Sequence, residues 1–216
     1  KERNMRERSI QLELNITFKT PFIVGSGFGI AGLVDSTTVK GNDNIIYLPA
    51  SSLKGKIRSE FKKNMEALNI PVCNSIIHSK TEICKFSDIK DACVVCRIFG
   101  SEYYQSSLVF EDGVIDVKTK EILSEIVKDK VIPACQSSVR PGIKINRQLK
   151  TAEEGALFTL EEVNPAITLT TPIYGSCYIT DDEYSYFKGT IETITHIGGN
   201  KAGGMGRCSI TLREVQ

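Results

Sequence analysis

A glycine-rich stretch near the carboxyl end of the chain, residues 198–207, combines five glycines with a lysine and an arginine. Glycine has no side chain, so consecutive backbone N–H groups of such a loop can form a concavity that binds an anion. Lys201 and Arg207 would add positive charge to that concavity. Neither of the two common glycine motifs for nucleotides is present, so we expect a polymer's phosphate. The alternative is a flexible turn between a helix and a strand.

A second expected phosphate site is the start of the helix that follows Pro49. Ser51 and Ser52 can cap this helix, whose first N–H groups lie at the positive end of its dipole. Gly55, in the first turn, costs about 1 kcal/mol relative to alanine, and close approach of a ligand backbone would justify that cost. The alternative is a capped helix with a solvated basic face. The cations on and beside that face are Lys54, Lys56, Arg58, Lys62 and Lys63.

Asp35 is the carboxylate best placed for catalysis. It lies in another glycine-rich loop, residues 25–36, beside Ser36 and Thr37. Such a carboxylate can hold a divalent cation or help to deprotonate a ribose 2′-hydroxyl, although an Asx turn would use the same residue. Histidine is scarce: if His78 binds a metal, only His196 remains as a general base. A Ser–His or Cys–His nucleophile is therefore poorly supported.

The chain has seven cysteines, and four of them fall within residues 73–96. In a cytoplasmic protein this clustering favours a metal over disulfides. Cys93 and Cys96 form a C-x-x-C knuckle, and with His78 and Cys84 they supply four ligands for tetrahedral, structural zinc. Cys73 competes as the fourth ligand if His78 points away. Unligated thiols or a redox pair are the alternative.

A third basic stretch, residues 140–150, places cations between apolar residues. Strict alternation would put Lys144 on one face of a strand and Ile143 and Ile145 on the other. A basic hairpin with an apolar side can wedge between stacked bases while its cations hold phosphates. A solvated hairpin is the alternative. The candidate nucleic-acid contacts here are Arg140, Lys144 and Arg147.

The 216 residues, 41% hydrophobic and 25% charged, have an ordinary globular composition. We expect one domain over 1–216, with insertions near 70–100 and 116–150. The given sequence contains no signal-peptide h-region and no apolar run near the ~18 residues of a membrane span, so we expect a cytoplasmic location and no membrane partner. A net charge of +1 confines any basic surface to one region.

Hydrophobic periodicity predicts the elements that position these residues. Alternation predicts strands at 9–18, 45–48, 108–115, 155–163 and 167–179, and a last strand from 208. A spacing of three and four predicts two helices, one from 51 and one from 181 or 182, the second ended by Gly198 at its C′ position. Two strand–helix–strand halves indicate an α+β fold of the ferredoxin or RRM type, an antiparallel sheet with helices on one face. The expected helical stripes are Leu53, Ile57, Phe61 and Met65, and Tyr184, Phe187, Ile191 and Ile194.

Four segments together resemble the RAMP superfamily of CRISPR effectors, specifically the repeated backbone subunit of type III complexes. They are the loop ending Leu33-Val34-Asp35-Ser36 and residues 48–58, 93–100 and 198–207. The second segment is similar to the family's P-x-S-S-L-K-G-x-x-R helix start, and the third to its zinc knuckle followed by R-hydrophobic-F-G. Residues 145–161 also resemble the family, where they follow a thumb-like hairpin.

The resemblance implies a core that polymerises along a guide CRISPR RNA, with further copies and other subunits of an effector complex. It also implies a thumb that kinks the guide–target duplex, and cleavage of the target RNA at Asp35 with a divalent metal such as Mg²⁺. An unstacked nucleotide can place its 2′-hydroxyl in line with its own phosphate. The aromatic signature of an ordinary RRM is missing, so sequence-specific base stacking is not expected. The implied guide contacts are Ser51, Ser52, Lys54, Gly55, Lys56, Arg58, Arg97, Gly199, Lys201, Gly203, Gly204, Gly206 and Arg207.

Three other functions remain open. The first is a non-catalytic RNA-binding backbone subunit in which Asp35 is inert. The second is a guide-processing endonuclease, for which only His196 would serve as the catalytic histidine. The third is a small-molecule phosphate enzyme, against which strongly salt-dependent RNA binding would argue.

Overall fold

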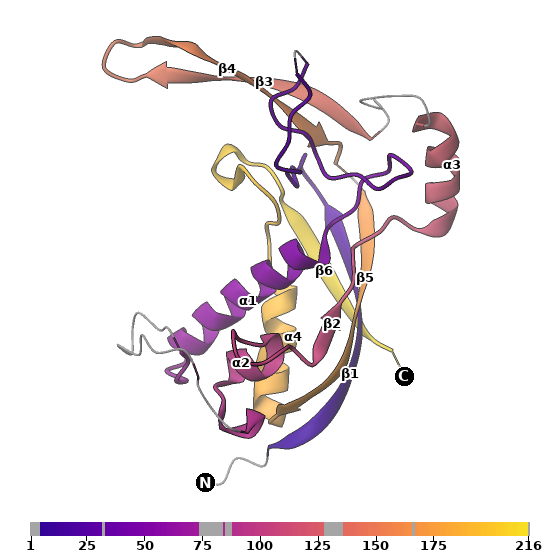
Figure 1. Cartoon of the computed structure of the whole chain (residues 1–216), viewed down its shortest axis with the longest axis vertical. Helices are drawn as coiled ribbons and strands as arrows, with labels where there is room; N and C mark the ends of the chain where they lie inside the picture. The colour runs from indigo at the N-terminus through magenta and orange to yellow at the C-terminus, as the bar shows by residue number, and fades with distance from the viewer. Residues whose placement is uncertain are drawn as a thin grey trace.

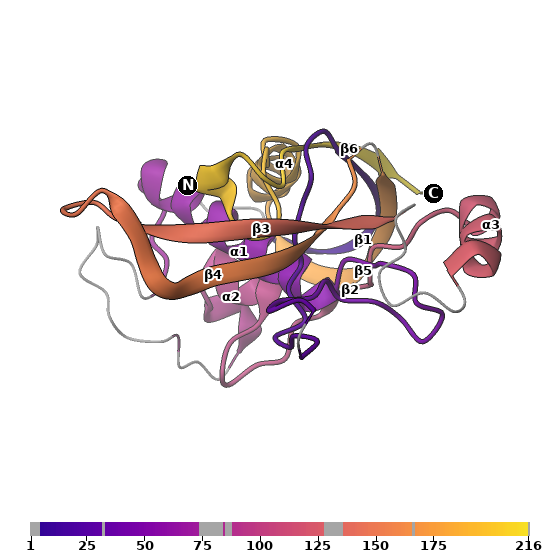
Figure 2. The same cartoon turned by 90° about the horizontal axis from the view of Figure 1, so that it is seen from above.

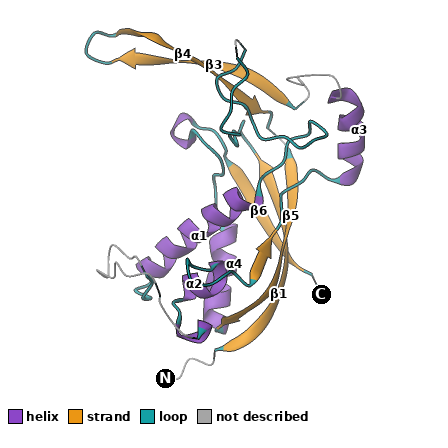
Figure 3. Cartoon of the chain, viewed as in Figure 1, coloured by secondary structure: helices purple, strands orange, loops and turns teal. Residues whose placement is uncertain are grey.

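The computed structural model describes residues 5–31, 33–73, 84, 88–127, 136–165 and 167–215. Its centre is a four-stranded antiparallel sheet in the order β2-β5-β1-β6. Helices α1, α2 and α4 cover one face of this sheet (Figures 1 and 3). Two strand–helix–strand units, β1-α1-β2 and β5-α4-β6, confirm the predicted ferredoxin-like α+β fold. The bounds are β1 Arg6–Phe18, α1 Ala50–Ala67, α2 Val94–Phe99, β2 Leu108–Phe110, β5 Thr168–Ile179, α4 Asp181–Glu192 and β6 Cys208–Glu214.

The core lies between the sheet and the helices. Strand β1 buries every second residue from Ile10 to Phe18, as its alternating sequence predicts. Both predicted helical stripes are buried. The rings of Phe61, Phe99 and Phe187, one from each helix, have centroids 5.9–6.0 Å apart. This packing fixes α1 and α4 against the sheet and so sets where their exposed residues face.

The helix ends differ from the expectation. Helix α1 has no side-chain cap from a serine; instead, Asp112 Oδ1 accepts a hydrogen bond from the Ala50 N–H at 2.7 Å. The carboxylate comes from the loop after β2, a contact that local sequence does not encode. Helix α4 ends at Glu192 with Thr193 as its C-cap, so Gly198 is not its C′ residue.

A two-stranded ribbon, β3 (Ser137–Asn146) and β4 (Thr151–Val163), projects from the body on the side of the helices (Figures 1 and 2). The predicted hairpin is therefore present, but its second strand is the one expected separately at 155–163. Helix α3 (Val117–Val127) occupies the start of the predicted insertion. The expected strand at 45–48 forms only isolated bridges, at Ile46 and Leu48. Two short 3-10 helices, Ile89–Asp91 and Lys201–Gly203, complete the described elements. No helix of the described ranges is long and apolar enough to cross a membrane.

Candidate nucleic-acid interface and metal centre

Asp35 fastens its loop to strand β4 of the ribbon. Its Oδ2 accepts hydrogen bonds from the Thr159 N–H at 2.6 Å and from Thr159 Oγ1 at 3.0 Å. The backbone N–H groups of Asp35 and Ser36 both donate to the Thr159 carbonyl, at 3.1 and 3.2 Å. The Thr159 N–H, followed by the Thr159 hydroxyl, holds the pKa of the exposed Asp35 carboxyl below its ordinary value. Asp35 therefore carries a full negative charge at neutral pH, which suits a cation ligand rather than a general base.

The Asp35 carboxylate lies beside an apolar part of the ribbon. Thr159 is opposite Pro141, and the next pair on the same face toward the tip is Ile143 and Leu157, about 7 Å further along. These two side chains are 51% and 68% exposed. A register irregularity follows between Ile143 and Ile145, so the strict alternation expected for this strand does not continue to the tip.

Glu161 forms a buried polar network where the ribbon joins the body. Its carboxylate is fully buried, pairs with Lys40 Nζ at 2.6 Å, and accepts from the Ser137 hydroxyl at 2.5 Å and the Thr38 N–H at 3.1 Å. Because Thr38 and Lys40 follow Asp35 in the chain, the network anchors the far end of the Asp35 loop. Sequence reasoning missed Glu161, since an acidic residue in a strand gives no sign of burial.

The cations expected on the ribbon are partly neutralised. Lys144 Nζ pairs with Glu153 at 2.6 Å, and Arg140 with Glu162 at 3.5 Å. Arg147 lies exposed at the turn between the strands. The ribbon thus combines exposed apolar side chains with balanced charge, rather than forming a strongly basic hairpin.

Helix α1 and the glycine-rich loop 198–207 meet at a hollow of about 520 Å³. Glu60 lies between Lys56 and Lys63, at 2.7 and 3.2 Å. Burial, followed by the nearby charge of Lys56, lowers the pKa of Lys201. Burial and then the charge of Arg58 lower the pKa of Lys54. The lysines outnumber the single carboxylate lining the hollow, so an anion would relieve their repulsion.

Four residues of the predicted phosphate site lie on the solvent side of α1. All four are exposed to solvent, and a Cβ added to Gly55 would meet nothing within 4 Å. No contact within the described part of the chain therefore requires a glycine at position 55. These residues are Ser51, Ser52, Gly55 and Arg58.

The glycines of the 198–207 loop pack against other backbone instead of forming an open cradle of N–H groups. The N–H of Gly199 donates to Ile23 O at 2.9 Å, and that of Gly206 to Pro21 O at 2.8 Å. The N–H groups of Gly203 and Gly204 bond to carbonyls inside the loop. The prediction that these four N–H groups bind an anion is therefore wrong, because each already donates to a backbone carbonyl. Lys201 and Arg207 remain as exposed cations of the loop.

Arg97 is a structural residue and not an exposed phosphate contact. Its side chain is buried, and its guanidinium pairs with Glu183 Oε1 at 2.7 Å. It also donates to the carbonyls of Ala92 and Tyr178, at 3.1 and 2.6 Å. Because these partners occupy the guanidinium, the expected RNA contact at Arg97 is corrected to a tie between α2 and α4.

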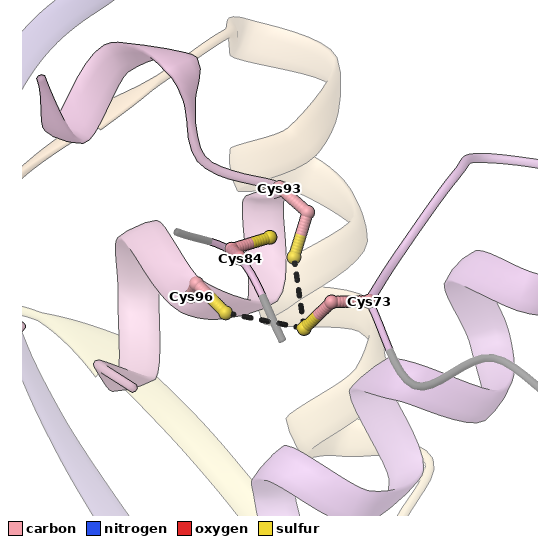
Figure 4. A group of neighbouring side chains, drawn as sticks. All are labelled: Cys73, Cys84, Cys93 and Cys96. Carbon is pink, nitrogen blue, oxygen red and sulfur yellow. Dashed lines mark hydrogen bonds between the residues drawn. The ribbon is translucent and has the colours of Figure 1, made fainter. Parts of the chain in front are cut away.

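Four cysteine sulfurs converge beside α2: those of Cys73, Cys84, Cys93 and Cys96 all lie within 4.8 Å of one another (Figure 4). The Cys73 sulfur is 3.4 Å from that of Cys96 and 3.8 Å from that of Cys93. Tetrahedral zinc with bonds of about 2.3 Å separates its sulfurs by about 3.8 Å, so the cluster fits this ion. The expected ligand His78 lies outside the described residues; Cys73, its competitor, occupies the fourth corner.

The cysteine cluster already favours one thiolate. A hydrogen bond with Cys96 is the main cause that lowers the pKa of Cys93 to about 4, whereas burial raises the pKa of Cys84 to about 11. The Cys93 thiol therefore ionises more readily than that of Cys84. A bound divalent cation would deprotonate the others, which is how thiol groups hold a metal.

Residues 15–209 match the family model described as the RAMP superfamily. No curated protein matches the chain. An apo type III-B Cmr-beta structure contains a chain with a TM-score of 0.59 and 16% identity, over 96% of this chain and 98% of that one. A type III-B Cmr-beta structure bound to cognate target RNA contains one with a TM-score of 0.63 and 14% identity, over 94% and 96%. At these identities the likeness is one of fold, and the family match covers most of the chain: it belongs to the RAMP superfamily.

Proposed function

We propose that the chain is a single-domain, guide-RNA-binding backbone subunit of a type III CRISPR effector complex that cleaves complementary target RNA at Asp35. The observation that carries the proposal is the attachment of the Asp35 loop to the ribbon, next to the exposed pair Ile143 and Leu157. An apolar wedge can unstack neighbouring bases. The carboxylate then lies beside the unstacked nucleotide. The fold likeness to a chain of a target-RNA-bound complex supports this assignment.

The chemistry requires positioning more than proton transfer by the protein. The 2′-oxygen of the unstacked nucleotide forms a bond to its own phosphorus while the bond to the 5′-oxygen of the next nucleotide breaks. The 2′-hydroxyl proton leaves to solvent, and the departing 5′-oxygen takes one up. Asp35 Oδ2 faces Thr159, which leaves Oδ1 for a divalent cation. Mg²⁺ bound by one carboxylate, phosphate oxygens and water would supply charge neutralisation.

The guide RNA is proposed to follow the surface between α1 and the glycine-rich loop. Lys56 and Lys201 line the hollow there, and Ser51, Ser52 and Arg58 are exposed along the helix. Helix starts and lysines bind phosphates without reading the base, which suits a guide of any sequence. Arg97 and the loop's paired glycine N–H groups have no part in this proposal.

The cysteine cluster is proposed to hold a structural zinc ion. Four sulfurs fill a tetrahedral shell and leave no open position for catalysis. Cys96 lies in α2 and Cys93 is its N-cap residue, so the ion would fasten Cys73 and Cys84 to this helix.

A non-catalytic backbone subunit is the second candidate function. The specific observation in its favour is that Asp35 already has a structural task, since its carboxylate accepts two hydrogen bonds from Thr159. Two substitutions separate the tasks. Asp35→Asn removes the charge but keeps an oxygen acceptor for Thr159, and Asp35→Ala removes both.

The test measures target cleavage and target binding by the assembled complex. We expect Asp35→Asn to reduce cleavage about 100-fold or more with binding unchanged. Thr159→Val removes the hydroxyl that donates to Asp35 Oδ2 and accepts from the Asp35 N–H, but it keeps the backbone bonds between the two residues, and it should reduce cleavage about 2- to 10-fold. Asp182→Asn, an exposed aspartate on α4, is the matched control and should cleave normally. Normal cleavage by Asp35→Asn, with loss only in Asp35→Ala, would assign Asp35 a purely structural role. Normal cleavage by both variants would show that cleavage does not depend on Asp35, and would favour the non-catalytic subunit.

A further inference from the structure

Phe28 presents its ring to solvent on the Asp35 loop. The residue is 78% exposed, the highest value among the large apolar side chains of the described residues. No aromatic or cation contact involves its ring within the described part of the chain. A lone exposed apolar residue is common on protein surfaces, so exposure alone does not indicate a binding role and the surrounding geometry must be considered.

The backbone of Phe28 is held at both of its polar groups. Its N–H donates to Ser26 Oγ at 3.1 Å, and its carbonyl accepts from the N–H and the hydroxyl of Thr37, at 3.0 and 2.9 Å. The hydroxyls of Ser26 and Thr37 also bond to each other at 2.7 Å. The ring is therefore displayed from an ordered turn, and little freedom remains to be lost when a ligand covers it.

The same turn brings the backbone beside Phe28 against the backbone of Asp35. A Cβ added to Gly29 would lie 2.6 Å from the Asp35 carbonyl oxygen and 2.7 Å from that of Val34. Only glycine permits this approach, so the residue after Phe28 touches the backbone of Asp35 itself. Thr37, which holds Phe28, follows Asp35 by two residues. Phe28 and Asp35 are thus carried by one hydrogen-bonded loop.

We propose that Phe28 is a stacking platform for the nucleobase that is unstacked at the Asp35 site. This inference rests on the proposed function. Base–aromatic stacking tolerates any base, so it agrees with a subunit that does not read sequence. It would offset the cost of taking the base out of its stack and hold the nucleotide for in-line attack.

The occupant is a base rather than a neighbouring protein because the apolar area is small. Gly27 and Gly29 flank the ring, and Leu33, 51% exposed, is the other large exposed side chain of the loop among its described residues. A stable protein interface buries about 800 Å² on each partner, far more than one ring offers. One base covers about one ring face.

The experiment is a double-mutant cycle on target binding. Complexes carry Asp35→Asn, so that no target is cut, together with Phe28→Ala, Phe28→Leu, Phe28→Trp or Leu33→Ala. Each binds a complementary target that is intact or has one abasic nucleotide, placed at every position in turn. We expect Phe28→Ala and Phe28→Leu to weaken binding of the intact target about 5- to 150-fold. Phe28→Trp and Leu33→Ala should bind normally, and an abasic nucleotide at the stacking position should abolish the difference.

The stacking role would be overturned by an equal loss for intact and abasic targets, or by no loss at all. A lower number of subunits per complex in Phe28→Ala would assign the ring to a protein contact and would equally overturn it. The experiment measures binding in complexes that do not cleave, so its outcome does not depend on whether Asp35 is catalytic. Failure of the assembled complex to bind any complementary RNA would instead remove the proposed function.

Discussion

Two buried carboxylates each join two elements of this molecule. Glu161 joins the ribbon to the end of the Asp35 loop, and Glu183 joins α4 to Arg97. Glu183 also accepts from the Thr180 N–H at 2.9 Å and completes a capping box. A buried pair adds little to stability in itself, but removing one partner leaves an uncompensated charge. Each carboxylate therefore fixes an arrangement rather than supplying most of the folding energy.

Glu161→Gln tests this view at the root of the ribbon. Ser137 and Thr38 donate to different oxygens of the carboxylate, so the single oxygen of the amide can keep only one of these two bonds, and Lys40, only 12% exposed, loses the Glu161 charge. We expect a loss of about 3 kcal/mol in the free energy of unfolding, and a melting temperature lower by roughly 6–12 °C.

The matched control for Glu161→Gln is Glu162→Gln on the same strand. Glu162 pairs with the half-exposed Arg140 at 3.5 Å. The Glu162 side chain is 14% exposed, but Arg140 stays in contact with water after the change, so we expect a loss of no more than about 1 kcal/mol. Equal effects of the two substitutions in thermal unfolding would contradict the role given to the Glu161 network.

At the scale of elements, the parts with regular periodicity could be predicted and the parts that depend on distant contacts could not. The core strand β1 and both long helices follow from local spacing of two and of three to four. The cap of α1 comes from Asp112, and the partners of Gly199 and Gly206 are the carbonyls of Ile23 and Pro21. Neither partner is near in sequence. A glycine in the sequence indicates a close contact of the backbone, but it does not identify the segment that is contacted.

For the cysteine cluster, the sequence left two sets of metal ligands open, which differ in whether His78 or Cys73 is the fourth ligand. The four-sulfur set predicts that Cys73→Ser lowers bound zinc well below one equivalent per chain, because one of four ligands is lost. His78→Ala should keep its zinc. Zinc is measured by elemental analysis of the purified chain, with unfolding in a chelator as a second readout. Loss of zinc in His78→Ala with retention in Cys73→Ser would restore the histidine set.

At the scale of the whole molecule, positive charge is local. The net charge is only +1, from 27 basic and 26 acidic residues. The face of the sheet away from the helices carries Glu7 and Glu13 as well as Arg213. The lysines around the hollow lie on the helix side instead. Any polyanion should therefore be guided to one side of the molecule, where the ribbon also projects.

The salt dependence of RNA binding tests this division of the surface. Each phosphate contact to a single strand adds about 0.7 to the slope of log affinity against log salt. Lys201→Ala should lower that slope by about 0.7 for a single-stranded guide, measured by fluorescence anisotropy at several salt concentrations. Arg213→Ala removes the same charge from the opposite face of the sheet and should leave the slope unchanged, because no phosphate is expected there. If both substitutions lowered the slope equally, binding would be a diffuse property of the net charge. If neither did, the hollow would not be where the guide runs.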